Sequence, residues 1–419
     1  MSDYPFFMTW TAQGNAAPIE LTGGDGVWFH STNNERWLDM GSLSYQASLG
    51  HGRTDIVDAI CDQAKRLCLS MPNAVYPEKI ALAQKLLELA PAGFTKVFFT
   101  LGGAEANENA LKMVKLVSGR TKVISRYRSY HGATMGALAL SGDYRRPPLG
   151  QSVVGIVHVL DTECAQCPGG IRSAHCTHPP ISTIPRVMDL EGPNTVAAVF
   201  LETVAGGNGV IIPPPGYMRT VREACNRHGA FLVCDEVLTG FGRTGRTFAF
   251  EHFDDVTPDI IVLGKAITAG YAPLGAVLVH DRIAQYFEDK TLYCGLTQYA
   301  HPLSIAAGLK AVEAFQQGEF NTRVTQLEPT FSAALDAMRA RHPAQVKRVR
   351  VIGLLAALDF DADPAQCKRL QAALLKRRVH THLRADLGTL ILAPPLCISD
   401  EELDQGLRLI EAAIKETWT

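Results

Sequence analysis

The sequence predicts an α/β fold built on a mainly parallel sheet. Residues 231–234 (Phe-Leu-Val-Cys) and 260–263 (Ile-Ile-Val-Leu) are unbroken apolar runs, the pattern of strands whose two faces are both buried. Two earlier stretches repeat apolar residues at helical spacing: Ile56, Ile60, Ala64 and Leu67 in the first, and Ile80, Ala83, Leu87 and Ala90 in the second. Buried strands that alternate with amphipathic helices are typical of the α/β class.

Length and charge narrow the possible functions. The 419 residues suffice for one large domain and a smaller one, and 47% of them are hydrophobic, as in ordinary globular proteins. Forty basic and 42 acidic residues give a net charge of −2 without a basic cluster, so binding to nucleic acid or an anionic membrane is not expected. Residues 1–5 lack the features of a signal peptide, and no apolar run approaches membrane-spanning length. We expect a soluble cytoplasmic enzyme.

Both apolar runs are followed by residues whose side chains can take part in catalysis. Asp235 follows the first run, and Gly264 and Lys265 follow the second. In an open parallel sheet, ligands bind beyond the carboxyl ends of the strands, so both ends should face one crevice. A carboxylate and an amine would then share a site. The alternative is a salt bridge that caps the sheet without any chemistry.

The residues around this pair resemble the class III aminotransferases, which use pyridoxal phosphate. The resemblance rests on residues 235–245, 258–261 and 264–266. It implies that Lys265 forms the internal Schiff base, that Asp235 pairs with the pyridine nitrogen, and that Val237 packs under the cofactor ring. A lysine in a dry pocket is a usable nucleophilic amine, and a carboxylate keeps the ring nitrogen protonated so that the ring can accept electrons.

A G-x-G-x-x-G pattern at Gly240, Gly242 and Gly245 would suggest a dinucleotide site. That fingerprint needs its first glycine directly after a strand and a helix at its third glycine. Here residues 235–239 intervene, and residues 246–250 favour a strand or a loop. We therefore reject the dinucleotide interpretation.

The N-terminal arm, residues 1–50, contains strand candidates near residues 26–29 and 37–39. For the aromatic residues Phe6, Phe7 and Trp10 we expect packing roles, with the site of a partner subunit as the alternative. Residues 44–52 resemble the substrate-pocket lining of ω-amino-acid and amine transaminases, and this resemblance assigns Tyr45 to the substrate pocket.

Residues 97–100 predict a strand, and Gly102, Gly103 and Ala104 introduce a helix over about 105–117. A strand, a glycine turn and a helix N-terminus form an anion site, because free backbone amides and the helix dipole both favour negative charge. A phosphate fits there. The family usually has Ser-Gly-Ser at these positions, so the site must depend mainly on backbone amides. The alternative is a tight turn without a ligand.

Three residues at other strand ends complete the expected cofactor site. Tyr130 and His131, in a Tyr-His-Gly sequence, match the family, and Tyr130 should stack on the cofactor ring. Residues 197–201 predict a buried strand that ends on Glu202, which would match the acid that organises the site. The family usually has proline next, and Thr203 replaces it. We expect Glu202 to pair with an arginine from elsewhere in the chain.

Two residues in the last third of the chain are assigned by resemblance. Residues 295–302 resemble the family's Gly-Phe-Thr-Tyr-x-Gly-His-Pro, which implies that Thr297 contacts the cofactor phosphate across a homodimer interface; Gln298 and Ala300 depart from that pattern. Arg384 stands ten residues before Pro394, the place of the mobile arginine, and a guanidinium there can hold an α-carboxylate or swing away. The alternative for Arg384 is a solvated surface arginine.

Cysteines and a histidine pair in one short loop could form a zinc site. The loop contains Cys164, Cys167, His175, Cys176 and His178. It is rich in proline and glycine, has no second C-x-x-C, and resembles a family loop without an implied metal role, so we favour reduced thiols and no metal. A further five cysteines are expected to behave as small buried hydrophobic residues: Cys61, Cys68, Cys225, Cys234 and Cys294.

As a whole, the resemblance implies fold type I: a large domain with a mainly parallel seven-stranded sheet and a smaller α+β domain built from both termini. The expected division is an N-terminal arm and part of the small domain (1–55), a pyridoxal-phosphate-binding domain (56–315) and a C-terminal small domain (316–419). It also implies a homodimer with shared active sites, with a tetramer as the alternative. The expected reaction is ping-pong transfer of an amino group from an amine or ω-amino acid to an α-keto acid, with pyruvate as the expected acceptor. A decarboxylase, an aminomutase and a non-catalytic cofactor-binding partner protein are the alternatives.

Overall fold

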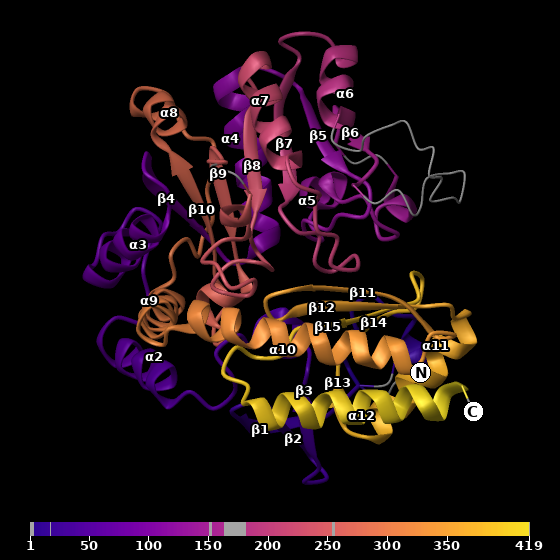
Figure 1. Ribbon diagram of the computed structural model, residues 1–419. Helices are drawn as coiled ribbons and strands as arrows, with labels where there is room; N and C mark the ends of the chain where they lie inside the picture. The colour runs from indigo at the N-terminus through magenta and orange to yellow at the C-terminus, as the bar shows by residue number, and fades with distance from the viewer. Residues whose placement is uncertain (1–3, 17, 151–152, 163–181, 254–255, 419) are drawn as a thin grey trace.

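The computed structural model describes residues 4–16, 18–150, 153–162, 182–253 and 256–418. A seven-stranded sheet in the order β4-β10-β9-β8-β7-β5-β6 lies in the upper part of the molecule in Figure 1. The strands are β4 (Phe94–Thr100), β5 (Lys122–Arg126), β6 (Ile156–Val159), β7 (Val196–Glu202), β8 (Phe231–Asp235), β9 (Ile260–Leu263) and β10 (Gly275–His280). Strands β5 to β9 run parallel, and only β10 is antiparallel to its two neighbours. The predicted mainly parallel seven-stranded sheet is confirmed.

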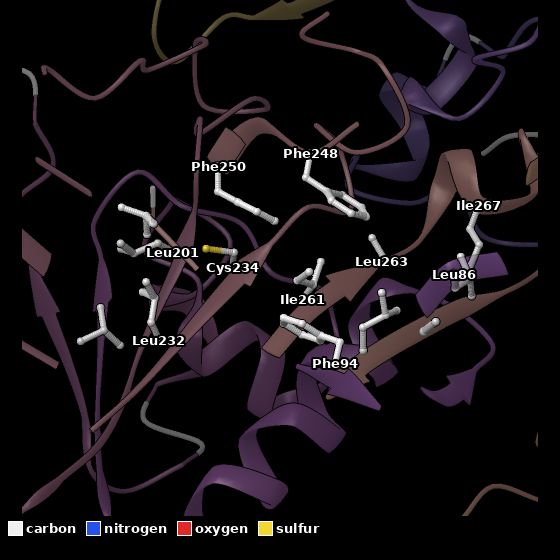
Figure 2. Close-up of a cluster of buried hydrophobic side chains, with 14 of the residues drawn as sticks. Leu86, Phe94, Leu201, Leu232, Cys234, Phe248, Phe250, Ile261, Leu263 and Ile267 are labelled. Carbon is white, nitrogen blue, oxygen red and sulfur yellow. The ribbon is translucent and has the colours of Figure 1, made fainter. Parts of the chain in front are cut away.

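Helices bury both faces of this sheet, which explains the unbroken apolar runs. One face packs against α4 (Gly103–Ser118), α5 (Met135–Leu140) and α8 (Asp281–Ala284). The other packs against α3 (Pro77–Leu89), α6 (Thr183–Glu191), α7 (Tyr217–His228) and α9 (Pro302–Gln317). Successive side chains of a strand point to opposite faces. In β8, Leu232 and Cys234 pack in the core on the α3, α6, α7 and α9 face (Figure 2). Val233 packs in the core on the opposite face.

Residues from both termini form a separate region beside the large sheet. One four-stranded sheet joins β1 (Leu21–Asp25), β2 (Trp28–Ser31) and β3 (Arg36–Asp39) to β13 (Val379–His380). A second contains β11 (Val346–Ile352), β12 (Leu355–Phe360), β15 (Thr389–Leu392) and β14 (His382–Arg384). The helices α10 (Phe320–Arg341), α11 (Pro364–Lys376) and α12 (Asp400–Trp418) pack on these strands (Figure 1). This arrangement supports the predicted small domain, whose exact boundaries stay a prediction.

Several local predictions can be compared with the structure. The first predicted helix is α2 (Thr54–Arg66) and the second is α3. Ser399 and Glu402, which the predictions above did not cover, form a capping box at the start of α12 with bonds of 3.0 and 3.1 Å. Residues 237–248 form turns and bends, so no α-helix starts at Gly245 and the dinucleotide fingerprint is correctly rejected.

The cysteine prediction is only partly correct. Cys225 and Cys234 are buried, whereas Cys61 and Cys68 are exposed. Helix α2 buries the face that carries Ile56 and Gln63, and Cys61 lies on another face of this helix. In the part of the chain that the structure describes, no helix combines the length and the apolar character that a membrane span requires.

Candidate active site

A cavity of about 690 Å³ lies at the carboxyl ends of the central strands. Strands β7 and β8 end on Glu202 and Asp235, which are paired in the sheet register, and Lys265 follows β9 by two residues. The predicted residues that line this cavity are Tyr45, Gly103, Ala104, Tyr130, His131, Glu202, Asp235, Val237, Lys265 and Arg384. Residues scattered over 340 positions of the chain thus meet at one place.

The Asp235 carboxylate is buried and held by three donors. Its Oδ2 accepts a hydrogen bond of 2.8 Å from Asn107 Nδ2 and lies 2.7 Å from His131 Nδ1. Its Oδ1 accepts a bond of 3.0 Å from the backbone N–H of Val237. These contacts fix the direction of the carboxylate while leaving it on the cavity wall.

Asn107 is a functional candidate that the sequence analysis missed. It is completely buried in α4, and its Nδ2 also contacts the backbone oxygens of His131 at 2.9 Å and Gly103 at 3.2 Å. Asn107 lies one helical turn after Gly103, on the same face of α4. The sequence signal for Asn107 was a polar residue four positions after Gly103, in the helix that begins at the predicted anion site.

Glu202 does not pair with an arginine, contrary to our expectation. Its Oε1 accepts a hydrogen bond of 2.9 Å from the backbone N–H of Tyr130, and its Oε2 one of 3.1 Å from that of Gly206. The nearby Arg126 instead donates to the backbone oxygen of Glu202. The loops after β5 and β7 therefore supply backbone N–H groups that bond to both oxygens of the Glu202 carboxylate. Burial raises the pKa of Glu202, and the charge of Asp235 contributes in the same direction.

Lys265 directly follows Gly264, the first residue after β9. The backbone of Lys265 has a positive φ of 44°. Its Nζ lies 5.2 Å from the centroid of the Tyr45 ring. Burial lowers the pKa of Lys265 below its ordinary value, and the negative charges of Asp235 and Glu202 act in the opposite direction. The net downward shift increases the fraction of neutral, nucleophilic amine at a given pH.

Tyr45 stands on the cavity wall together with His382, which the sequence analysis also missed. The two rings stack with their centroids 3.9 Å apart. His382 Nε2 lies 2.9 Å from the backbone oxygen of Gly41, and burial lowers the pKa of His382 to about 3, so the ring is neutral near pH 7. His382 and Arg384 are two residues apart in β14, so they share a face of the strand. This spacing was the sequence signal that His382 lies in the same cavity as Arg384.

Trp10 and Tyr130 form an aromatic pair that also lines the cavity. The rings of Trp10 and Tyr130 meet edge to face with their centroids 6.3 Å apart. The Arg145 guanidinium lies 4.5 Å from the centroid of the Tyr130 ring and 5.2 Å from that of Trp10. Trp10 thus lines the cavity of its own chain, which neither of the expected roles described. Arg145 lies in the loop after α5, and no sequence signal indicated it.

The N-terminus of α4 opens onto the cavity through Gly103 and Ala104. A Cβ at Gly103 would lie 2.8 Å from the Val237 side chain, so glycine permits the close contact between α4 and this valine. Gly102 precedes the helix with an extended φ of 178° and does not line the cavity. The predicted strand, glycine turn and helix arrangement is present.

Arg384 reaches the cavity from β14, and its guanidinium already has partners. Nε and Nη2 donate to the two carboxylate oxygens of Asp386 at 2.9 and 2.8 Å. Nη1 donates to the backbone oxygen of Gly207 at 2.7 Å and to Asn208 Oδ1 at 2.9 Å. Arg384 is therefore a cavity residue and not a free surface arginine.

Two expectations are not placed at this site. Thr297 is exposed and does not line the cavity of the described chain. The cysteine loop with Cys164, Cys167 and Cys176 lies outside the described residues. Among the residues that are described, no group of three or more His, Cys, Asp or Glu side chains could hold a metal ion.

Comparison with known proteins identifies the family. Residues 10–414 match the model of class III aminotransferases. An ω-amino acid–pyruvate aminotransferase of Pseudomonas putida is 31% identical over 95% of this chain and 93% of its own length. An uncharacterised aminotransferase of Bacillus subtilis is 32% identical over 94% of this chain and 90% of its own.

A solved structure of taurine:2-oxoglutarate aminotransferase from Bifidobacterium kashiwanohense, in complex with pyridoxal phosphate and glutamate, is 36% identical and superposes with a TM-score of 0.91. The match covers 98% of this chain and 95% of the chain in the solved structure. These relatives are aminotransferases, in agreement with the cavity and its Lys265–Asp235 pair. The chain therefore belongs to the class III aminotransferases, pyridoxal-phosphate-dependent enzymes of fold type I.

Proposed function

We propose that this aminotransferase moves an amino group from an amine or ω-amino acid to an α-keto acid, with pyruvate as the acceptor, by a ping-pong mechanism. The observation that carries the proposal is the convergence of Lys265 and Asp235 on one cavity at the ends of β8 and β9. The Pseudomonas putida relative supports the choice of substrates, because its name specifies an ω-amino acid donor and pyruvate.

The residues of the cavity fit pyridoxal phosphate. Its volume of about 690 Å³ lies in the range of roughly 300–1,000 Å³ that is usual for small-molecule sites. The cofactor has an anionic phosphate, an aldehyde and a basic ring nitrogen. The N-terminus of α4, the amine of Lys265 and the carboxylate of Asp235 are groups of matching chemistry, and all three reach the same cavity.

Each residue would hold a different part of the cofactor. Asp235, oriented by Asn107 and His131, would hold a proton at the ring nitrogen. Tyr130 and Val237 would pack on the ring, since both line the cavity. The amides of Gly103 and Ala104, which line the cavity, would receive the phosphate. Glu202 would keep the loop of Tyr130 in place through its bond of 2.9 Å to that backbone N–H.

Pyridoxal phosphate, when bound, supplies the aldehyde that takes the amino group and a protonated ring that accepts the electrons released from the substrate carbon. Lys265 Nζ would remove the proton from that carbon and deliver it during the transfer, which requires a neutral amine. The lowered pKa of Lys265 favours this form. Arg384 would leave Asp386 to hold the α-carboxylate of the acceptor.

We also propose a cytoplasmic homodimer in which Thr297 contacts the cofactor phosphate of the partner subunit. Thr297 is exposed in the single chain, as a residue that serves another subunit would be. Apolar side chains at Leu69, Met71 and Val75 are 78%, 70% and 74% exposed, and they lie on one short segment after α2. Such a group on a single chain indicates a surface that another protein covers. Sedimentation equilibrium should give twice the mass of the chain, and a stable active monomer would contradict the shared site.

The experiment compares Lys265→Ala with Lys347→Ala, a lysine on the exposed side of β11 that pairs with Asp361. Both variants receive the same amine and pyruvate, and alanine formation is measured. Lys265→Ala should lower turnover by at least about 100-fold, the usual contribution of a positioned acid–base group, while Lys347→Ala should match the parent. Normal alanine formation by Lys265→Ala would overturn the proposed function.

A further inference from the structure

The imidazole of His382 has one nitrogen with a hydrogen-bond partner and one without. Its Nε2 lies 2.9 Å from the backbone oxygen of Gly41. A carbonyl oxygen can only accept a hydrogen bond, so Nε2 must carry the hydrogen. Burial lowers the pKa of His382 to about 3, so the ring is neutral near pH 7 and has a single N–H. Nδ1 is therefore an acceptor without a hydrogen of its own.

This acceptor opens onto the substrate cavity. His382 is one of the residues that line the cavity of Lys265. Among the described residues, no hydrogen bond involves Nδ1 of His382, and Nδ1 is not one of the buried polar atoms that lack a partner. An atom that is neither bonded nor buried is accessible, and the cavity is the space that His382 borders.

Contacts on several sides hold the ring in this position. One face stacks on Tyr45 with the centroids 3.9 Å apart, and His380 meets the ring edge to face at 5.3 Å. His380 Nδ1 lies 2.9 Å from the buried carboxylate of Asp39. The same carboxylate accepts a bond of 3.1 Å from the N–H of Gly41, the residue whose oxygen holds Nε2. His382 therefore has little freedom to turn Nδ1 away from the cavity.

A group bound at Nδ1 can belong to the same small molecule as the reacting amine. Lys265 Nζ lies 5.2 Å from the centroid of the Tyr45 ring, which is 3.9 Å from the imidazole, so a short carbon chain spans the two places. A carboxylate or sulfonate cannot donate a hydrogen bond to Nδ1. A second ammonium can donate one, but Arg145 and Arg384 line the same cavity and repel a cation. A hydroxyl is a donor without charge, and it suits this position best.

We propose that Nδ1 of His382 accepts a hydrogen bond from a hydroxyl group of the amine donor, so that amino alcohols are favoured over alkylamines of the same length. The proposal rests on the proposed function and narrows the class of donor. An alkyl group at the same place would leave the acceptor without a partner, and this loss discriminates between the two classes. His382 thus determines specificity and takes no proton.

The test follows the donor step in the holoenzyme as the change in cofactor absorbance. The donors are linear amino alcohols from 2-aminoethanol to 5-aminopentanol, the alkylamines in which a methyl group replaces each hydroxyl, and 1,4-diaminobutane. His382→Phe keeps a ring beside Tyr45 and removes both nitrogens. In His382→Asn the side-chain oxygen can take the place of Nδ1. The matched control is His30→Phe, because His30 lies in β2 and does not line the cavity.

At limiting concentration, one amino alcohol should react with the parent about 2- to 12-fold faster than its alkylamine, which is the range of a neutral hydrogen bond. His382→Phe should remove this preference, His382→Asn should keep part of it, and His30→Phe should keep all of it. A role of His382 that is only structural would slow both classes of donor equally and leave the preference intact.

Three results would overturn the proposal: no preference in the parent at any chain length, a preference that survives in His382→Phe, or a greater preference for 1,4-diaminobutane than for the amino alcohols. If none of these amines reacts while an ω-amino acid does, the proposal also fails and the proposed function stands. If no donor at all changes the absorbance, the proposed function itself fails, which is a distinct result.

Discussion

Replacing Asn107 by alanine tests whether Asp235 is held in place from α4. The two hydrogens of Nδ2 serve three acceptors, the Asp235 carboxylate at 2.8 Å and two backbone oxygens at 2.9 and 3.2 Å. At most two of these bonds have full strength at once. A bond to a charged group contributes about 1.5–3 kcal/mol and a neutral one about 0.5–1.5 kcal/mol, so the variant should lose about 2–4.5 kcal/mol of unfolding free energy.

The matched control is Asn109→Ala. Asn109 is also buried in α4, but its Nδ2 donates to one acceptor among the described residues, the backbone oxygen of Glu105 at 2.7 Å. The control should lose about 0.5–1.5 kcal/mol and bind the cofactor normally. Urea unfolding of both holoenzymes and titration of the apoenzymes with pyridoxal phosphate give the two quantities. Equal losses in Asn107→Ala and Asn109→Ala, or unchanged cofactor affinity in Asn107→Ala, would refute the reasoning.

Two further predictions use other contacts. Gly103→Ala places a Cβ 2.8 Å from Val237 and should weaken cofactor binding about 5- to 150-fold, the equivalent of the ~1–3 kcal/mol that overpacking costs. Gly102→Ala has free space around its Cβ and should bind the cofactor normally, and fluorescence titration of both variants tests the difference. Burial raises the pKa of Glu236 from 4.5 to about 7, so the folded state binds this proton more tightly than the unfolded state does. The bound proton therefore stabilises the folded state fully below pH 4.5, and this stabilisation is lost as the pH rises through about 7. Glu236→Gln should therefore have a free energy of unfolding that falls less between pH 5 and pH 8 than that of the parent, and an equal fall in both would count against the raised pKa.

The elements that follow from local pattern were predictable from the sequence. The runs at 231–234 and 260–263 are apolar at every position, which is typical of strands covered on both faces, and their ends place Asp235 and Lys265 at one sheet edge. The same reasoning placed Glu202, the last residue of β7, at this edge of the sheet. Its partners were not predictable, because the backbone amides of Tyr130 and Gly206 reach it through the paths of two loops.

The rest of the site depends on contacts between distant segments. Arg145 reaches the cavity because the loop after α5 folds toward Trp10 in the N-terminal arm, and neither segment has a periodic pattern that indicates this contact. His382 is next to Tyr45 only because β14 and residues 41–45 meet across the region formed by both termini. The role of Thr297 depends on a second subunit, so it stays a prediction.

The most direct test of amino transfer in this cavity is a single-turnover experiment on the holoenzyme. A panel of amines with and without carboxylates is added first, and pyruvate is added after the excess donor has been removed. We expect an ω-amino acid to change the absorbance of the bound cofactor, and pyruvate to restore it with one alanine formed per restored site. If no donor changes the absorbance, or if no α-keto acid reverses the change, the cavity does not carry out the proposed reaction.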